Sequence, residues 1–406
     1  EDRQNARENI QQYDWARSMR DGAVENAEAY LNEYSLDDIW NLVTSQAVAR
    51  SAFISPNYHW DTEYLDSWAT LDRPWKMTDG EYIFPTNDFA SYRESGRDDR
   101  GMFDPDLADD QYLVNEEHPE MGESWGVDDG YGWQDTNDDL GQGEDAWWNF
   151  AAYYNHWAVW RPGGVVRLVR AFTDAFLLTG NKRYSRACAV LLDRIADVYP
   201  EMDVSAYRSP RGGGHYRNTT GGRQTGKVIG SHWEPNLIRP VLRAYDAIFP
   251  GMEDDQALVE FLAGKTEEYP GLSSKGTIGE IRKNIEDGIL REILPAAKES
   301  QLAPARGQLP AVTTSARVLD EPDDYTRRAL EWVFQPGGEI FTGDVWYKEP
   351  DAWETTGGNV MAKLVDREGR DGYFDEAAPL YNPIAQASVL DIGNLLRGYD
   401  GFDGAD

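Results

Sequence analysis

Apolar residues recur every three or four positions along much of the chain after residue 163, as one buried face of an α-helix requires. The first such stripe runs from Val165 to Phe176 and is followed by the stop signal Thr179-Gly180-Asn181. The same spacing predicts further helices over 184–198, 237–249, 278–293, 310–319, 324–335 and 384–399.

The first 150 residues have a different pattern. A rough apolar stripe over 8–48 predicts two helices, and Ser35-Leu36-Asp37-Asp38 has the form of a capping box that opens the second one. Residues 50–150 are rich in Asp, Gly, Pro and aromatic residues and show little periodicity. An irregular region of this length is usually functional or covers a core. We therefore divide the chain into an N-terminal region, 1–150, and a helical region, 151–406, within one structural unit.

The near absence of alternating apolar and polar residues predicts an all-α fold. Helix pairs joined by loops indicate antiparallel packing in an (α/α) toroid or solenoid. The helices share no fixed period, which argues against an ordinary repeat solenoid and favours an incomplete toroid. In a toroid the loops meet at a concave end, where we expect a cleft.

Charge limits the possible partners. The chain has 39 Lys and Arg against 72 Asp and Glu, for a net charge of −33. Such a field repels nucleic acid, and no apolar run is long enough for a membrane span. An anionic sugar polymer would need its own local cations. The acidic excess and the scarcity of Lys relative to Arg indicate a high-salt source, where the charge is screened.

Sulfur and metal chemistry are not expected. Cys188 is the single cysteine and lies on an apolar helix face, so we interpret it as a core residue. Asp135-Thr136-Asn137-Asp138-Asp139 resembles a calcium loop, but Leu140 replaces the required glycine and Glu144 has the wrong offset. We therefore expect no metal and no cofactor.

Four clusters of polar and aromatic residues carry candidate chemistry. They are Tyr153-Tyr154-Asn155-His156-Trp157 with Trp160-Arg161, Ser231-His232-Trp233-Glu234, Arg306-Gly307-Gln308, and Arg370-Asp371-Gly372 with Glu376 and Pro379-Leu380-Tyr381-Asn382.

The order of these clusters resembles the heparinase II/III-like polysaccharide lyases over about residues 150–400. A helix pair of that family is similar to the stretch from Trp160-Arg161 through Thr179-Gly180 to Tyr184. The next helix of the family is similar to the stretch from His232-Trp233-Glu234 to Arg243-Ala244-Tyr245-Asp246. Arg370-Asp371-Gly372 and Glu376 through Asn382 resemble a third motif. The resemblance implies an α/α toroid followed by a C-terminal β-sandwich, which is absent from this chain and which we expect in a longer protein.

The resemblance also implies β-elimination on a uronic-acid-containing polysaccharide. A base removes the C5 proton, an acid protonates the C4 oxygen, and a neutraliser stabilises the charged carboxylate. Tyr381 matches the family tyrosine that serves as base or acid. Gln308 stands where the family has an asparagine; this is a departure, although its amide can donate the same hydrogen bond. His156 and His232 are the alternative neutralisers or proton carriers.

Other residues of the clusters are candidates for binding the anionic polysaccharide. Glu234 either orients His232 or binds a sugar hydroxyl, Arg161 and Arg239 suit a uronate carboxylate, and Arg306 adds positive charge. We expect His156, His232, Gln308 and Tyr381 to converge on one concave face. The full set of expected binding residues is Asn155, Trp157, Arg161, His215, Tyr216, Trp233, Glu234, Arg239, Arg306 and Asn382.

Two other functions remain open. An inverting (α/α)6 glycoside hydrolase would use two separated carboxylates, for which Asp128, Asp129, Asp135 and Glu144 are candidates. A non-catalytic relative would bind a polysaccharide without cleaving it. Each function implies a secreted, periplasmic or cell-surface protein, whose signal peptide would precede this chain.

Overall fold

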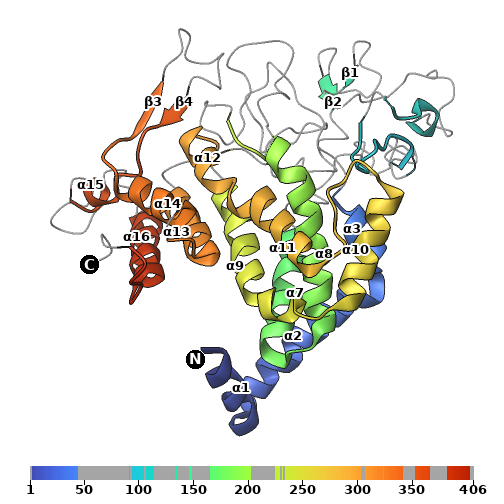
Figure 1. The fold of residues 1–406 in the computed structure, drawn as a ribbon, viewed down its shortest axis with the longest axis horizontal. Helices are drawn as coiled ribbons and strands as arrows, with labels where there is room; N and C mark the ends of the chain where they lie inside the picture. The colour runs from blue at the N-terminus through green and yellow to red at the C-terminus, as the bar shows by residue number, and fades with distance from the viewer. Residues whose placement is uncertain are drawn as a thin grey trace.

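The computed structural model of the chain is mostly helical (Figure 1). This confirms the expected all-α class in its coarse form. None of the described helices has the length and apolar composition of a membrane-spanning segment. The structure describes residues 2–43, 91, 94–104, 107–113, 133–135, 146–148, 165–202, 225–228, 231, 234–302, 307–322, 324–341, 353–365 and 382–402.

Five helices pack one against the next and form a first row. They are α2 (Asp14–Glu33), α7 (Val165–Thr179), α9 (Glu234–Met252), α13 (Gln308–Leu319) and α16 (Asn382–Leu396).

A second row packs against the first. Its centre is α8 (Lys182–Val198), which contacts both α7 and α9. Around α8 lie α3 (Leu36–Asn41), α10 (Gln256–Glu268), α11 (Ile278–Ile285) and the π-helix η6 (Glu286–Leu290). The remaining helices are α1 (Asp2–Gln12), η1 (Asp110–Leu113), η4 (Tyr199–Glu201), α12 (Ile293–Lys298), α14 (Tyr325–Phe334) and α15 (Val360–Val365).

Two short antiparallel hairpins complete the described elements. Strand β1 (Trp133–Asp135) pairs with β2 (Ala146–Trp148), and β3 (Glu339–Phe341) pairs with β4 (Trp353–Thr355). Both hairpins lie at one end of the helical body, whereas α1 lies at the opposite end (Figure 1). We call the first of these the hairpin end.

The turn between α7 and α8 shows how the sequence sets this packing. Gly180 adopts φ +72°, a conformation that glycine tolerates best, and so ends α7. Asn181 then caps α8 by accepting a hydrogen bond from the Arg183 amide at 3.0 Å. Two residues between helices leave α7 and α8 antiparallel and in contact. The Tyr184 hydroxyl donates to Glu28 at 2.7 Å, which ties α8 to α2.

Helix α8 is the centre of the core. Cys188, Val190, Leu191 and Leu192 are fully buried in it. Burial raises the pKa of Cys188 to about 12, so the thiol stays protonated. The interpretation of Cys188 as a packing residue is confirmed.

The structure also differs from the expected helices. Tyr13 is extended and separates α1 from α2, so the N-terminal stripe contains three helices rather than two. The expected helix over 278–293 is interrupted by η6. Gly288 lies in η6 where an added Cβ would be 2.3 Å from the Ala196 carbonyl oxygen, so a side chain would displace the π-helix from α8. Helix α10 was not predicted.

Candidate functional site

The beginnings of α9 and α13 lie against each other, and each follows one of the sequence clusters. Gly307 precedes α13 with φ +113°. A Cβ at Gly307 would lie 3.4 Å from Pro235 Cβ and 3.5 Å from Arg239 Nη1. The cluster that ends at Glu234 and the cluster that ends at Gln308 therefore meet at one place.

Glu234 is buried at this junction as the first residue of α9. Its Oε2 accepts a hydrogen bond from the Val228 amide at 3.0 Å, which fastens the segment before α9 to the helix. Tyr199 is also buried close by, and burial followed by the charges of Glu234 and Glu292 raises the pKa of this tyrosine well above its usual range. Glu234 thus has a positioning role for segment 225–228, whatever its relation to His232.

Gln308 is completely buried, and its amide is committed to the main chain. The Nε2 atom donates to the Ala297 carbonyl at 3.0 Å and to the Leu302 carbonyl at 2.8 Å. Both amide hydrogens are used by these contacts. A substrate carboxylate could receive a hydrogen bond from Gln308 only after one of the contacts is broken, so this geometry gives Gln308 a packing role.

Hydrogen bonds join further segments at the hairpin end. Thr225 Oγ1 donates to the Ser300 carbonyl at 2.9 Å, and the hydroxyls of Ser300 and Thr355 are 2.9 Å apart. Lys227 Nζ donates to the Pro200 carbonyl at 2.9 Å. The ends of α8, α12 and β4 are thereby brought to the same region as the starts of α9 and α13.

A pocket lined by arginines extends from this junction along the groove between α7 and α9. It has a volume of about 370 Å³ and begins at Pro235 and Asn236, in the first turn of α9. Arg170, Arg239 and Arg243 line it, together with Asp174. We call it the arginine pocket.

Charges interact strongly in this pocket. Arg239 forms a close ion pair with Asp391 of α16, and Arg243 lies 3.8 Å from the same carboxylate. Burial, together with the neighbouring Arg239, lowers the pKa of Arg243, while Asp391 opposes the shift. Burial raises the pKa of Asp174 against the attraction of Arg170. Three arginines therefore meet two aspartates, which leaves a small local excess of positive charge in a strongly acidic chain.

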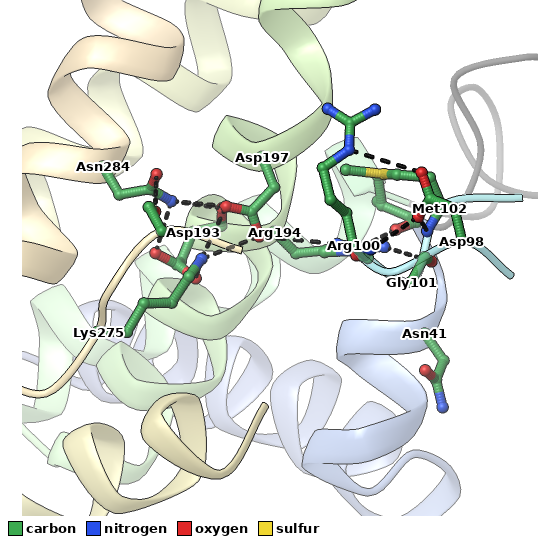
Figure 2. Close-up of polar contacts among 12 residues, drawn as sticks. Asn41, Asp98, Arg100, Gly101, Met102, Asp193, Arg194, Asp197, Lys275 and Asn284 are labelled. Atoms are coloured by element: carbon green, nitrogen blue, oxygen red, sulfur yellow. Dashed lines mark hydrogen bonds and ion pairs between the residues drawn. The ribbon is translucent and has the colours of Figure 1, made fainter. Parts of the chain in front are cut away.

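A second charged cluster is buried within the helical body (Figure 2). Lys275 pairs with Asp193 and Asp197 of α8, and Asn284 donates to each of these carboxylates at 2.9 Å. Burial, with the added repulsion of Asp197, raises the pKa of Asp193 to about 6 against the attraction of Lys275. Burial alone would lower the pKa of Lys275, but the two carboxylates outweigh it and raise that pKa.

Arg194 extends the cluster to the N-terminal region. Its guanidinium donates to the carbonyls of Val43, Arg100 and Gly101 at 2.7, 2.9 and 2.6 Å, and it lies 3.9 Å from the Trp40 ring centroid. Burial lowers the pKa of Arg194 to about 10. These contacts hold α3 and residues 98–102 on α8. Asp193 and Arg194 have no exposed surface and the Asp197 side chain is 4% exposed, so the cluster offers no opening to a substrate.

Three of the predicted site residues are described with their side chains: Glu234, Gln308 and Arg239. The structure places them together at the start of α9 and α13. Asn382 begins α16 and is described only in its backbone. The expected convergence of His156, His232 and Tyr381 with Gln308 stays a prediction. The residues that lie outside the described part are Asn155, His156, Trp157, Arg161, His215, Tyr216, His232, Trp233, Arg306 and Tyr381, and with them Asp128, Asp129 and Glu144.

Sequence reasoning did not single out Arg170, and it named Arg243 only as part of a motif of the family resemblance, without a binding role. A signal was present, because Arg239 and Arg243 are four residues apart and therefore share one face of α9. In the motifs that carry the family resemblance, Thr179-Gly180 and Tyr184 have a visible packing role. Among the described residues no group of three or more His, Cys, Asp or Glu side chains is placed to hold a metal ion.

Comparison with known proteins adds no relative. No protein-family model, curated protein or solved structure matches this chain.

Proposed function

We propose that the chain is the helical part of an extracellular polysaccharide lyase that cleaves a uronic-acid-containing polymer by β-elimination, with Tyr381 as base and acid. The observation that carries the proposal is the arginine pocket. It begins directly after the cluster His232-Trp233-Glu234 and places Arg239 and Arg243 together in a chain of net charge −33. A local excess of cations in so acidic a protein is what binding of an anionic sugar requires.

The two rows of helices support the finer fold that this proposal needs. Successive packing of α2, α7, α9, α13 and α16, with α8 behind α7 and α9, is the arrangement expected for part of an (α/α) toroid. The exposed side of the first row would be its concave side, and the arginine pocket opens there. The proposal also includes the C-terminal β-sandwich that follows the toroid in the family that this chain resembles.

The structure changes how we divide the chemical roles. A lyase must stabilise the extra negative charge that builds up on the uronate when C5 loses its proton. Because both amide hydrogens of Gln308 are occupied, we assign neutralisation to an arginine of the pocket or to His156 or His232 rather than to Gln308. An arginine can bind the carboxylate through two parallel hydrogen bonds.

The test is a panel of alginate, glycosaminoglycans, pectins and ulvan, followed by ultraviolet absorbance of the C4–C5 double bond. A lyase produces this double bond and a hydrolase does not. We expect one polymer to give unsaturated products and Tyr381→Phe to lower the rate by about 10²–10⁴-fold, the usual contribution of a general base. Substrate binding should persist, because Phe keeps the ring.

The buried amide of Gln308 also favours a second candidate, a non-catalytic polysaccharide-binding relative. Binding of a polymer with no unsaturated product, unaffected by Tyr381→Phe, would select this function. Cleavage to saturated reducing ends would instead select the hydrolase.

A further inference from the structure

One arginine of the pocket is already paired with a carboxylate of the protein itself. Asp391 on α16 pairs with Arg239 on α9, and Arg243 lies 3.8 Å from the same carboxylate. In this ion pair Arg239 keeps 19% of its side chain exposed and Asp391 keeps 35%. Water reaches both partners, so an incoming carboxylate can compete with Asp391 for Arg239, although it must break the existing ion pair to do so.

We propose that the arginine pocket binds the carboxylate of a single sugar residue and that Asp391 occupies the same cations as an internal competitor until the sugar displaces it. The identity of the ligand as a sugar rests on the proposed function. The competition between Asp391 and an incoming carboxylate rests on the geometry alone.

The lining of the pocket fits this class of ligand. Three arginines face one aspartate, Asp174, among the described lining residues. Arg243 keeps 55% of its side chain exposed, so its guanidinium is accessible to a ligand. Asn236 and Thr173 add uncharged polar groups that suit hydroxyls. A volume of about 370 Å³ accommodates a sugar ring together with its carboxylate, rather than a bare ion alone.

The experiment measures binding of glucuronate by calorimetry, with glucose as the uncharged control and sulfate as the bare-anion control. Asp391→Asn keeps the shape of the side chain but removes its charge. We expect it to bind glucuronate about tenfold more tightly, and Arg243→Gln to bind it at least about tenfold more weakly, as loss of one charge-assisted hydrogen bond implies. Arg239→Gln should also weaken binding.

Two matched variants control for net charge. Arg183→Gln removes an exposed arginine that pairs with Glu28 outside the pocket, and Asp287→Asn removes an exposed helical aspartate that pairs with Lys283. Neither should change the affinity for glucuronate. Each variant is checked by thermal unfolding, so that loss of fold is not mistaken for loss of binding.

Each outcome decides one part of the inference. Unchanged affinity in Arg243→Gln removes the pocket as the binding site, and unchanged or weaker affinity in Asp391→Asn removes the competition. Sulfate binding as tight as glucuronate shows a bare-anion site and overturns the sugar carboxylate. If glucuronate binds but no polymer is cleaved, the proposed lyase function is contradicted and the pocket remains a binding site. If a polymer is cleaved and Arg243→Gln leaves the Michaelis constant unchanged, the lyase function stands and the pocket is not the binding site.

Discussion

Gln308 illustrates how one side chain can have the chemistry for catalysis and the contacts of a core residue. An amide can donate to a substrate carboxylate, but it can equally close two main-chain carbonyls that a helix end leaves unpaired. Gln308 donates to the carbonyls of Ala297 and Leu302, at the junction of α12 and α13; the Ala297 carbonyl also accepts from the Ser300 amide at 3.2 Å. Its replacement should therefore affect the free energy of unfolding.

We expect Gln308→Ala to lower the free energy of unfolding by about 1–3 kcal/mol, because the buried amide is lost and the Leu302 carbonyl loses its side-chain donor. Urea unfolding followed by circular dichroism measures this change. The matched control is Gln335→Ala, since Gln335 makes its hydrogen bond to the Thr356 carbonyl at an exposed position. A stable Gln308→Ala protein with a raised Michaelis constant would instead restore the neutraliser role.

Single residues differed in how far their sequence context decided their role. Cys188 could be assigned to the core because it lies within a stripe of apolar residues at helical spacing. The capping box at Ser35 was also predictable, since its partner Asp38 lies within one turn, and both of its hydrogen bonds are present. The role of Gln308 could not be predicted from the sequence, because its hydrogen-bond partners belong to α12 and to the loop that follows α12.

Among the elements, α8 fastens distant parts of the chain to the helical body. Through Asp193, Asp197 and Arg194 it holds the loop at Lys275, helix α11 at Asn284, and residues 98–102 (Figure 2). The cluster balances two carboxylates with one lysine and one arginine. Removing the lysine leaves the buried carboxylates without their main partner.

We expect Lys275→Met to cost about 3–5 kcal/mol of stability near neutral pH, as for other broken buried ion pairs. The loss should be smaller at pH 5. The folded-state pKa of Asp193 is already raised to about 6 and rises further without Lys275, so the variant takes up a proton on acidification that the unfolded chain, with an ordinary aspartate pKa, does not. Urea unfolding of both proteins at pH 5 and pH 7 gives the comparison. An equal loss at the two pH values would contradict it.

The elements were predictable where periodicity alone determines them. Helices over 165–179, 182–198, 308–319 and 325–334 agree with the apolar stripes. The stripe over 278–293 was continuous, but close contact of Gly288 with Ala196 makes the chain pass through a π-helix there. A tertiary contact of this kind leaves no periodic signal in the sequence. The same holds for Asp391, which pairs with Arg239 of the arginine pocket although the two residues are 152 positions apart.

At the scale of the whole molecule, the net charge opposes the function that the pocket supports. A chain of −33 repels an anionic polymer at long range, while in the proposed function Arg170, Arg239 and Arg243 would attract the carboxylates of the polymer at contact. These two effects respond differently to salt. The screening length falls from about 30 Å at 0.01 M to about 3 Å at 1 M, so salt removes the repulsion first and weakens contacts within the pocket less.

We therefore expect association with the uronate polymer to become faster with added salt, by about tenfold or more between 0.01 M and 1 M, the lower end of the range by which electrostatic fields change association rates. Stopped-flow tryptophan fluorescence measures the rate, and glucuronate, with a single charge, should show a much smaller increase. Proteins that bind polyanions through a basic surface show the opposite slope, because they release counterions on binding. A rate that falls with salt would mean that the polymer meets a basic surface wide enough to outweigh the acidic remainder of the chain, and that the arginine pocket is only a part of it.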